Sequence, residues 1–195
     1  MKKAYLGWWM IAMAILGVAA CGDLKDLGVL LDSGSVILPN CDDYCELMST
    51  CDGDNLQYNT AGPCRSFCEN LPLGNTGDAT GNSVGCRHFY AIQAGEEPEK
   101  YCSAAGPSGG DVCGGSCQAF CEVTMEVCQG DEAAYAGLLA CTTACSDFPS
   151  EPAYSANVPD AHTLACRFKH LNFATLDSKT HCPHLEAVSS VCNDD

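Results

Sequence analysis

Apolar residues recur at helical spacing near the C-terminal end of the chain. Between residues 161 and 174, Leu164, Phe168 and Leu171 form an apolar stripe along one face of a predicted helix, which Asp160 is placed to cap. Alternation of apolar and polar residues, the pattern of a half-buried strand, is nearly absent from the chain. The pattern therefore predicts a mainly α fold.

Two more helices are predicted in the same part of the chain. Residues 132–145 are rich in good helix formers and follow Asp131, a suitable N-cap residue. Pro183 suits the first turn of a helix over residues 184–192. Stretches rich in glycine, proline and small polar residues predict long loops at residues 74–85 and 150–159.

The first 20 residues have the layout of an export signal. A basic start at Lys2 and Lys3 is followed by an apolar run over residues 5–20, which is too short and wrongly flanked for a stable membrane-spanning helix. Residues 1–20 are therefore interpreted as a signal peptide.

The end of this segment, Val18-Ala19-Ala20-Cys21, resembles the lipobox of bacterial lipoproteins. The resemblance implies cleavage before Cys21, acylation of that cysteine and attachment of the protein to a membrane by lipid. Several acyl chains on one residue anchor far more firmly than the single chain that gives marginal binding. Gly22 stands where an aspartate would favour retention in the inner membrane, so the outer membrane is expected.

The other sixteen cysteines fall into two matching sets of eight. The first set is Cys41, Cys45, Cys51, Cys64, Cys68, Cys86, Cys102 and Cys113, and the second is Cys117, Cys121, Cys128, Cys141, Cys145, Cys166, Cys182 and Cys192. Each member of the first set has a counterpart 76 to 80 positions later. This spacing predicts a duplicated unit of that length.

Identity between the units extends beyond cysteine. Tyr58 matches Tyr135, and an arginine follows the sixth cysteine of each unit at Arg87 and Arg167, where structural ion pairs are expected. The predicted organisation is a signal peptide at 1–20, a lipid-anchored tether at 21–38, and cysteine-rich repeats at 39–115 and 116–195. The repeats are assigned to no family of known function.

Export to an oxidising compartment implies that the sixteen cysteines form about eight disulfides. Within the units, the cysteine pairs Cys41/Cys45, Cys64/Cys68, Cys117/Cys121 and Cys141/Cys145 are spaced i, i+4, which places both sulfurs of a pair on one helix face. This arrangement resembles helical hairpins held by paired cysteines in other small oxidised proteins. In that model the pairs are Cys41–Cys68, Cys45–Cys64, Cys117–Cys145 and Cys121–Cys141. An alternative lacing, Cys45–Cys68 with Cys51–Cys64, also suits an antiparallel helix pair.

The charge balance excludes one class of partner. The chain has 9 basic and 25 acidic residues, a formal net charge of −16. Such a surface repels nucleic acid and anionic lipid headgroups, so nucleic-acid binding is excluded. No Cys-x-x-Cys is present, which removes the usual haem-attachment and thioredoxin-like motifs, and no cofactor is expected.

Residues 106–110, Gly-Pro-Ser-Gly-Gly, formally match the G-x-S-x-G pattern of hydrolases. A nucleophile elbow requires a buried strand before the serine and a helix after it, within a sheet that this chain has no room for. Ser108 is therefore expected in a constrained turn, and no catalytic residue is predicted.

The one histidine cluster in the sequence is His181-Cys182-Pro183-His184, with His170 and His162 nearby. Imidazole is a good ligand for zinc and copper, and a helix can bring His170 towards the same side. The corresponding positions of the first unit hold Tyr90, Tyr101 and Ala104. His170, His181 and His184 are thus candidate metal ligands in one repeat only.

The sequence as a whole predicts a small, disulfide-rich, mainly α protein of two tandem helical repeat units with long loops. The favoured function is a non-catalytic binding or scaffolding module, lipid-anchored in the bacterial cell envelope, whose partner is a protein or a glycan. The alternative is a periplasmic or surface metal-handling protein that uses histidine and carboxylate ligands.

Overall fold

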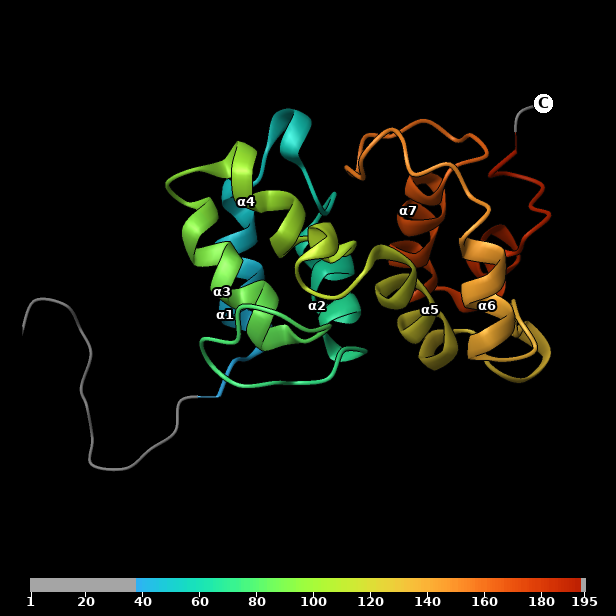
Figure 1. Ribbon diagram of the computed structural model, residues 1–195, viewed down its shortest axis with the longest axis horizontal. Helices are drawn as coiled ribbons and strands as arrows, with labels where there is room; N and C mark the ends of the chain where they lie inside the picture. Colours follow the sequence, from blue (N-terminus) through green and yellow to red (C-terminus); the bar gives the residue numbers. More distant parts are fainter. Residues whose placement is uncertain (1–37, 194–195) are drawn as a thin grey trace, which may run out of the picture. The chain divides into compact units, whose positions relative to one another are not determined.

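The chain folds as two consecutive sets of four α-helices, and the computed structural model describes residues 38–193 (Figure 1). The first set is α1 (Cys41–Leu47), α2 (Ala61–Glu69), α3 (Val84–Ala94) and α4 (Pro98–Ala105). The second set is α5 (Ser116–Val127), α6 (Leu138–Cys145), α7 (Leu164–Ala174) and α8 (Ser178–His181). Short 3-10 helices are η2 (Met48–Thr50), η3 (Gly53–Asn55), η4 (Gly109–Asp111), η5 (Gly130–Glu132) and η6 (Cys182–Leu185). Residues 38–193 contain no strand, so the mainly α prediction is confirmed.

Eight disulfides bond the sixteen cysteines, and the two sets of helices share one connectivity. In each set the first cysteine is bonded to the fifth, the second to the fourth, the third to the seventh and the sixth to the eighth. The bonds are Cys41–Cys68, Cys45–Cys64, Cys51–Cys102, Cys86–Cys113, Cys117–Cys145, Cys121–Cys141, Cys128–Cys182 and Cys166–Cys192. The hairpin pairs that spacing favoured are formed, and the alternative lacing is not.

The disulfides divide into two structural roles. In the first repeat, Cys41 and Cys45 stand one turn apart on α1 and face two cysteines on α2, so two bonds hold an antiparallel hairpin. The Cys51–Cys102 bond then joins the end of this hairpin to α4. In a chain-entropy account each bond contributes about 3 to 4 kcal/mol. Bonds of this size compensate for a core that is small in each repeat.

The paired arginines bind backbone carbonyls. Arg87 is fully buried, and its guanidinium donates to the carbonyls of Ser83 (3.3 Å), Gly106 (3.0 Å) and Pro107 (3.0 Å). Arg167 makes the same contacts 80 residues later, with the carbonyls of Thr163, Glu186 and Ala187. The expectation of structural ion pairs was wrong for both residues, since no carboxylate contacts either guanidinium within the described part of the chain.

A tyrosine hydroxyl serves the same carbonyl position in both repeats, from different elements. In the first repeat Tyr44 of α1 donates to the carbonyl of Ala105 at 2.7 Å and accepts from Tyr58 at 2.9 Å. In the second repeat α5 carries Phe120 instead, and Tyr135 donates to the carbonyl of Leu185. A buried carbonyl without a partner is costly. The second repeat has Phe120 in place of Tyr44, and the hydroxyl of Tyr135 makes the equivalent hydrogen bond instead.

The predicted helix at 161–174 begins three residues later than expected. Thr163 caps α7, because its hydroxyl accepts the backbone N–H of Cys166 at 3.1 Å. Asp160 lies before the cap and accepts from Lys169 at 2.8 Å instead. Asp160 therefore binds a side chain of α7, and the assignment of Asp160 as the N-cap was wrong.

The helix predicted over 132–145 is shorter than expected. Asp131 lies in η5 and makes no capping hydrogen bond, and the regular helix α6 starts at Leu138. The five residues between η5 and α6 depart from helical geometry, which lets Tyr135 reach the carbonyl of Leu185. The tertiary hydrogen bond thus overrides a favourable local helix propensity.

The helix predicted over 184–192 does not form. Pro183 is the second residue of the short 3-10 helix η6 (Cys182–Leu185), as its fixed φ favours, but the chain leaves helical geometry after Leu185. Arg167 takes the carbonyls of Glu186 and Ala187, which a continuing helix would use for its own ladder. Residues 186–192 therefore follow an irregular, bent path, which the arginine contacts and the Cys166–Cys192 disulfide hold in place.

Hydrogen bonds between the repeats join the loop that follows α6 to the loop that precedes α2. The backbone N–H of Ala156 donates to the carbonyl of Leu56 at 2.7 Å, and the hydroxyl of Tyr154 donates to the carbonyl of Gln57 at 3.0 Å. The buried apolar residues of both repeats form one continuous core. The two repeats therefore share an interior, and a hollow lies on the surface where they meet.

Candidate functional site

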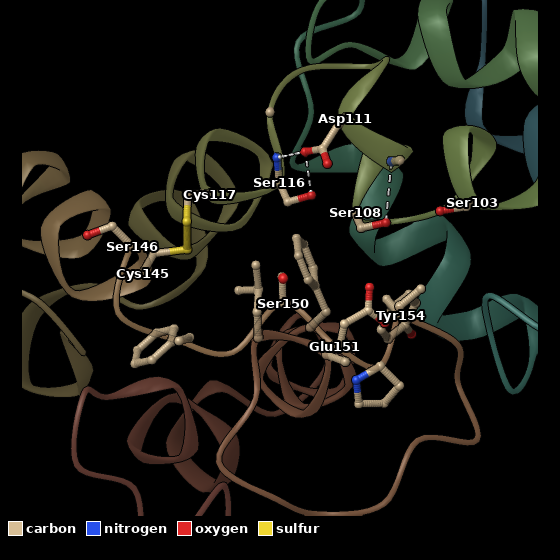
Figure 2. Close-up of a pocket in the computed structure, with 18 residues that line it drawn as sticks. Ser103, Ser108, Asp111, Ser116, Cys117, Cys145, Ser146, Ser150, Glu151 and Tyr154 are labelled. Atoms are coloured by element: carbon tan, nitrogen blue, oxygen red, sulfur yellow. Dashed lines mark hydrogen bonds between the residues drawn. A yellow bond between two sulfur atoms is a disulfide. The ribbon is translucent and has the colours of Figure 1, made fainter.

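A hollow lined by both polar and apolar residues lies between η4 and the start of α5 on one side and the loop after α6 on the other (Figure 2). Its volume is about 650 Å³. Five serines and two carboxylates contribute to the lining: Ser103, Ser108, Ser116, Ser146, Ser150, Asp111 and Glu151. Phe148, Tyr154 and Phe168 form part of its wall. The hollow thus combines hydroxyl groups, acidic groups and aromatic surface, and we refer to it as the inter-repeat pocket.

Ser108 lies in a turn at the edge of the inter-repeat pocket and is mostly buried. Its hydroxyl accepts a long hydrogen bond of 3.4 Å from the backbone N–H of Gly110 (Figure 2). The turn follows helix α4, and Arg87 holds the two carbonyls just before the serine. The segment that matches G-x-S-x-G is therefore a turn held by Arg87. No strand precedes it in the described residues, whereas a nucleophile elbow requires one.

The charged groups of the pocket are all acidic. Among the described residues that line it there is no histidine, lysine or arginine. Asp111 is held by two hydrogen bonds of 2.8 Å from the backbone N–H and the hydroxyl of Ser116 (Figure 2). Ser116 is thus the serine of this lining that donates to a carboxylate, and no imidazole lies among the described lining residues. The chemistry of the lining suits binding of polar groups.

The three candidate metal ligands converge in the second repeat. His170 comes from α7, His181 ends α8 and His184 lies in η6. Nδ1 of His170 lies 3.2 Å from Nδ1 of His181 and 3.1 Å from Nδ1 of His184. His162 is not part of this cluster, because its ring packs edge-on against Phe148. We refer to His170, His181 and His184 as the histidine triad.

Burial and a carboxylate define the environment of His170. Its side chain is only 8% exposed, and its Nε2 lies 3.3 Å from Oδ1 of Asp160. Burial lowers the pKa of His170 to about 4, with a further lowering from His184, although Asp160 acts in the opposite direction. Burial also lowers the pKa of His181. Both rings are therefore neutral at pH 7 and carry a free lone pair.

The equivalent place in the first repeat has no triad. The rings of Tyr90 and Tyr101 stack there, with centroids 5.9 Å apart, and Ala104 stands at the third position. The sulfurs of Cys166 and Cys192 also lie near His170, but they are joined in a disulfide and supply no thiolate. The triad is therefore a histidine site, and it is confined to the second repeat.

Comparison with known families identifies the repeated unit. The family model described as the BfoA family C-terminal domain matches the chain twice, over residues 40–117 and 114–193. The protein belongs to the BfoA family. The two matches confirm the tandem repeat that cysteine spacing predicted, and each copy of the BfoA domain contains one set of four disulfides. No solved structure matches the chain.

Cys21, the predicted lipidation site of this BfoA-family protein, lies outside the described residues, as do the signal peptide and nearly all of the tether. Within residues 38–193, none of the helices has both the length and the apolar character that crossing a bilayer requires. Attachment to a membrane through Cys21 remains a prediction from the lipobox.

Two features of the BfoA domains were missed in the sequence. The inter-repeat pocket joins residues between Ser103 and Phe168 that are distant in sequence, and no sequence pattern marks such a surface. Asp160 was read as a helix cap, whereas it contacts His170. A signal for the second was present: the first repeat has Thr80 at the equivalent position, so the aspartate accompanies the histidines.

Proposed function

We propose that this BfoA-family protein is a non-catalytic binding module of the bacterial cell envelope, attached by lipid at Cys21, and that it binds a glycan in the inter-repeat pocket. The observation that carries the proposal is the pocket lining, in which five hydroxyls and two carboxylates surround aromatic side chains without any basic group. Sugars combine hydroxyl groups with apolar ring faces, so hydroxyls, carboxylates and aromatic rings are complementary to them.

The negative charge of the protein limits the kinds of glycan that are expected to bind. A formal net charge of −16 repels anionic polymers, and the two carboxylates of the pocket add to that field locally. Neutral or amine-bearing sugars are therefore favoured over phosphorylated or sulfated ones. The disulfides next to the pocket support the same role, because Cys117–Cys145 fixes one wall before any ligand binds (Figure 2). A pre-formed site reduces the ordering cost of binding.

The experiment is a binding screen of neutral, amine-bearing and anionic glycans with the full chain, purified in detergent after export into an oxidising periplasm. Ser150→Trp fills the pocket from an exposed position, and Ser190→Trp is the matched control on an exposed serine that does not line it. We expect a neutral or amine-bearing glycan to bind, Ser150→Trp to abolish binding and Ser190→Trp to leave it unchanged.

Two outcomes would overturn the proposal. If no glycan binds, or if Ser150→Trp binds as the parent does, the pocket is not a glycan site and a protein partner becomes the leading reading. If a fluorophosphonate probe labels Ser108, or purified protein turns over an ester or glycoside, the protein is catalytic. Lipid attachment has a separate test, because Cys21→Ser should remove the acylated N-terminal peptide from the mass spectrum and release the protein from membranes.

A further inference from the structure

We propose that the histidine triad is a binding site for one divalent transition-metal ion of the zinc and copper class. The inference is independent of the inter-repeat pocket, because none of the three histidines lines that hollow. His170 is contributed by α7, His181 by the end of α8 and His184 by η6, so one metal ion would join three elements of the second repeat. No thiolate takes part, which makes this an all-imidazole site.

The spacing of the nitrogens fits a metal ion. Zinc–nitrogen bonds are about 2.0 to 2.1 Å long, so two ligands of a tetrahedral site lie about 3.3 Å apart. The Nδ1 atoms of His181 and His184 lie 3.2 and 3.1 Å from Nδ1 of His170. One ligand nitrogen from each of the three rings lies within 4.8 Å of the other two. The triad therefore already has the size of a coordination shell.

Hydrogen bonding alone does not account for this convergence. Nε2 of His170 faces the carboxylate of Asp160, so the ring carries its proton there and presents a bare lone pair at Nδ1. Two other imidazole nitrogens approach that single lone pair, and one lone pair accepts one good hydrogen bond. A cation instead accepts one lone pair from each of the three rings at once.

Asp160 has the position of a supporting residue for a metal ligand. Histidines that bind metals usually donate their other ring N–H to a carboxylate or carbonyl, which fixes the tautomer and orients the ring. The Oδ1 atom of Asp160 lies 3.3 Å from Nε2 of His170 and accepts from Lys169 at 2.8 Å. Lys169 balances the carboxylate charge, so Asp160 orients His170 without itself entering the site.

The first repeat shows that the fold does not require these residues. The same helices and the same four disulfides form there with Tyr90, Tyr101 and Ala104 at the triad positions and Thr80 in place of Asp160. All four positions differ together, whereas Arg87 and Arg167 keep their structural contacts in both repeats. The triad and its carboxylate are thus an addition to a frame that folds without them.

Access to the site is open on one side. His170 is buried, while His181 and His184 are half-buried. Three protein ligands leave one position of a four-coordinate ion for water or an incoming ligand, which is the pattern of exchangeable or reactive metal sites. By the usual order of affinity for nitrogen ligands, Cu²⁺ should bind more tightly than Zn²⁺.

The test measures metal stoichiometry and affinity on the full chain, purified in detergent with all eight disulfides formed. Zn²⁺ and Cu²⁺ are titrated against a competing chelator, and Co²⁺ is added as a probe whose visible absorption reports tetrahedral coordination. We expect one metal ion per chain. In the variant His170→Tyr/His181→Tyr/His184→Ala, which installs the residues of the first repeat, we expect affinity to fall by more than about 100-fold, since even an outer-shell partner is typically worth about 10- to 100-fold.

Controls separate coordination from folding. His88→Ala removes a half-buried histidine in the first repeat and should leave metal affinity unchanged. Asp160→Asn should weaken binding by about 10- to 100-fold while the Co²⁺ spectrum keeps its tetrahedral form, as expected for an orienting residue. If the triple variant fails to fold by circular dichroism, His184→Ala alone serves, because the first repeat carries alanine there, and a loss of at least about 10-fold is expected.

The proposal is overturned if the parent chain binds neither Zn²⁺ nor Cu²⁺ at micromolar concentration. It is also overturned if His184→Ala retains parental affinity, or if His88→Ala loses as much affinity as the triad variant. Because glycan binding is measured on different residues, either proposal can fail while the other stands.

Discussion

Replacing Arg87 with methionine tests whether the buried arginine organises its repeat. The guanidinium is fully buried and donates to three backbone carbonyls, of which those of Gly106 and Pro107 lie 3.0 Å away. Methionine has similar bulk and no donor, so Arg87→Met keeps most of the packing and leaves these carbonyls without their partner.

The magnitude follows from opposing terms. Each hydrogen bond from a charged donor is worth about 1.5 to 3 kcal/mol, and each buried carbonyl left unpaired costs about 1 to 3 kcal/mol. Against this, the variant no longer buries a positive charge, and removing such a charge recovers part of the loss. We therefore expect the free energy of unfolding to fall by about 3 to 5 kcal/mol. Lysine has no guanidinium fork, so Arg87→Lys should recover only part of this loss.

The assay is equilibrium unfolding in guanidinium chloride with the disulfides intact, followed by circular dichroism. Arg65→Met is the matched control, because Arg65 makes a 2.9 Å ion pair with Asp42 in which both side chains are more than half exposed. Such a surface pair contributes at most about 1 kcal/mol. If Arg87→Met destabilises the protein no more than Arg65→Met does, the carbonyl contacts do not hold the repeat and the reasoning is refuted.

Three more predictions follow from the described contacts. Tyr44→Phe should lower the free energy of unfolding by about 1 to 2 kcal/mol, measured by denaturant unfolding, because the buried Ala105 carbonyl loses its donor. Burial raises the pKa of Tyr44 to about 12, so the folded chain holds the phenol proton more tightly. Stability should stay constant below pH 10 and fall towards pH 12 by about 1.4 kcal/mol per pH unit from this group, a slope that Tyr44→Phe should remove from unfolding curves. Replacing Cys51 and Cys102, which are 51 residues apart, with alanine should lower the free energy of unfolding by about 4 kcal/mol. Replacing Cys45 and Cys64, which are 19 residues apart, should lower it by about 3 kcal/mol. Equal losses in denaturant unfolding would contradict the loop-length argument.

The disulfide frame was the part of the fold most accessible from sequence. Cysteines at i, i+4 share a helix face, so Cys41 with Cys45, and Cys64 with Cys68, favoured an antiparallel hairpin laced by two bonds, although a second lacing was also compatible with this spacing. The long-range bonds were not accessible. Cys51–Cys102 depends on where α4 packs, and that position is set by tertiary contacts such as the Tyr44 hydroxyl on Ala105.

Helix boundaries were predicted wrongly where tertiary hydrogen bonds compete with local helix propensity. Residues 132–137 favour a helix by composition, but Tyr135 is needed at the Leu185 carbonyl, and α6 begins only at Leu138. Residues 186–192 form no helix because Arg167 binds two carbonyls that a helix would use. In both cases a hydrogen bond between residues distant in sequence determines whether the segment is helical. The residues of the segment alone therefore do not predict its structure.

Comparison of the two repeats separates residues that the fold needs from residues that it tolerates. Arg87 and Arg167 occupy equivalent positions and donate to equivalent backbone carbonyls, so both repeats use this arginine to hold their fold. At the triad positions one frame holds a tyrosine stack and the other holds converging imidazoles. Since both repeats close the same four disulfides, the difference between them cannot be a requirement of folding. Duplication has thus left the second BfoA domain with three converging imidazoles at positions where the first shows that the fold accepts other side chains.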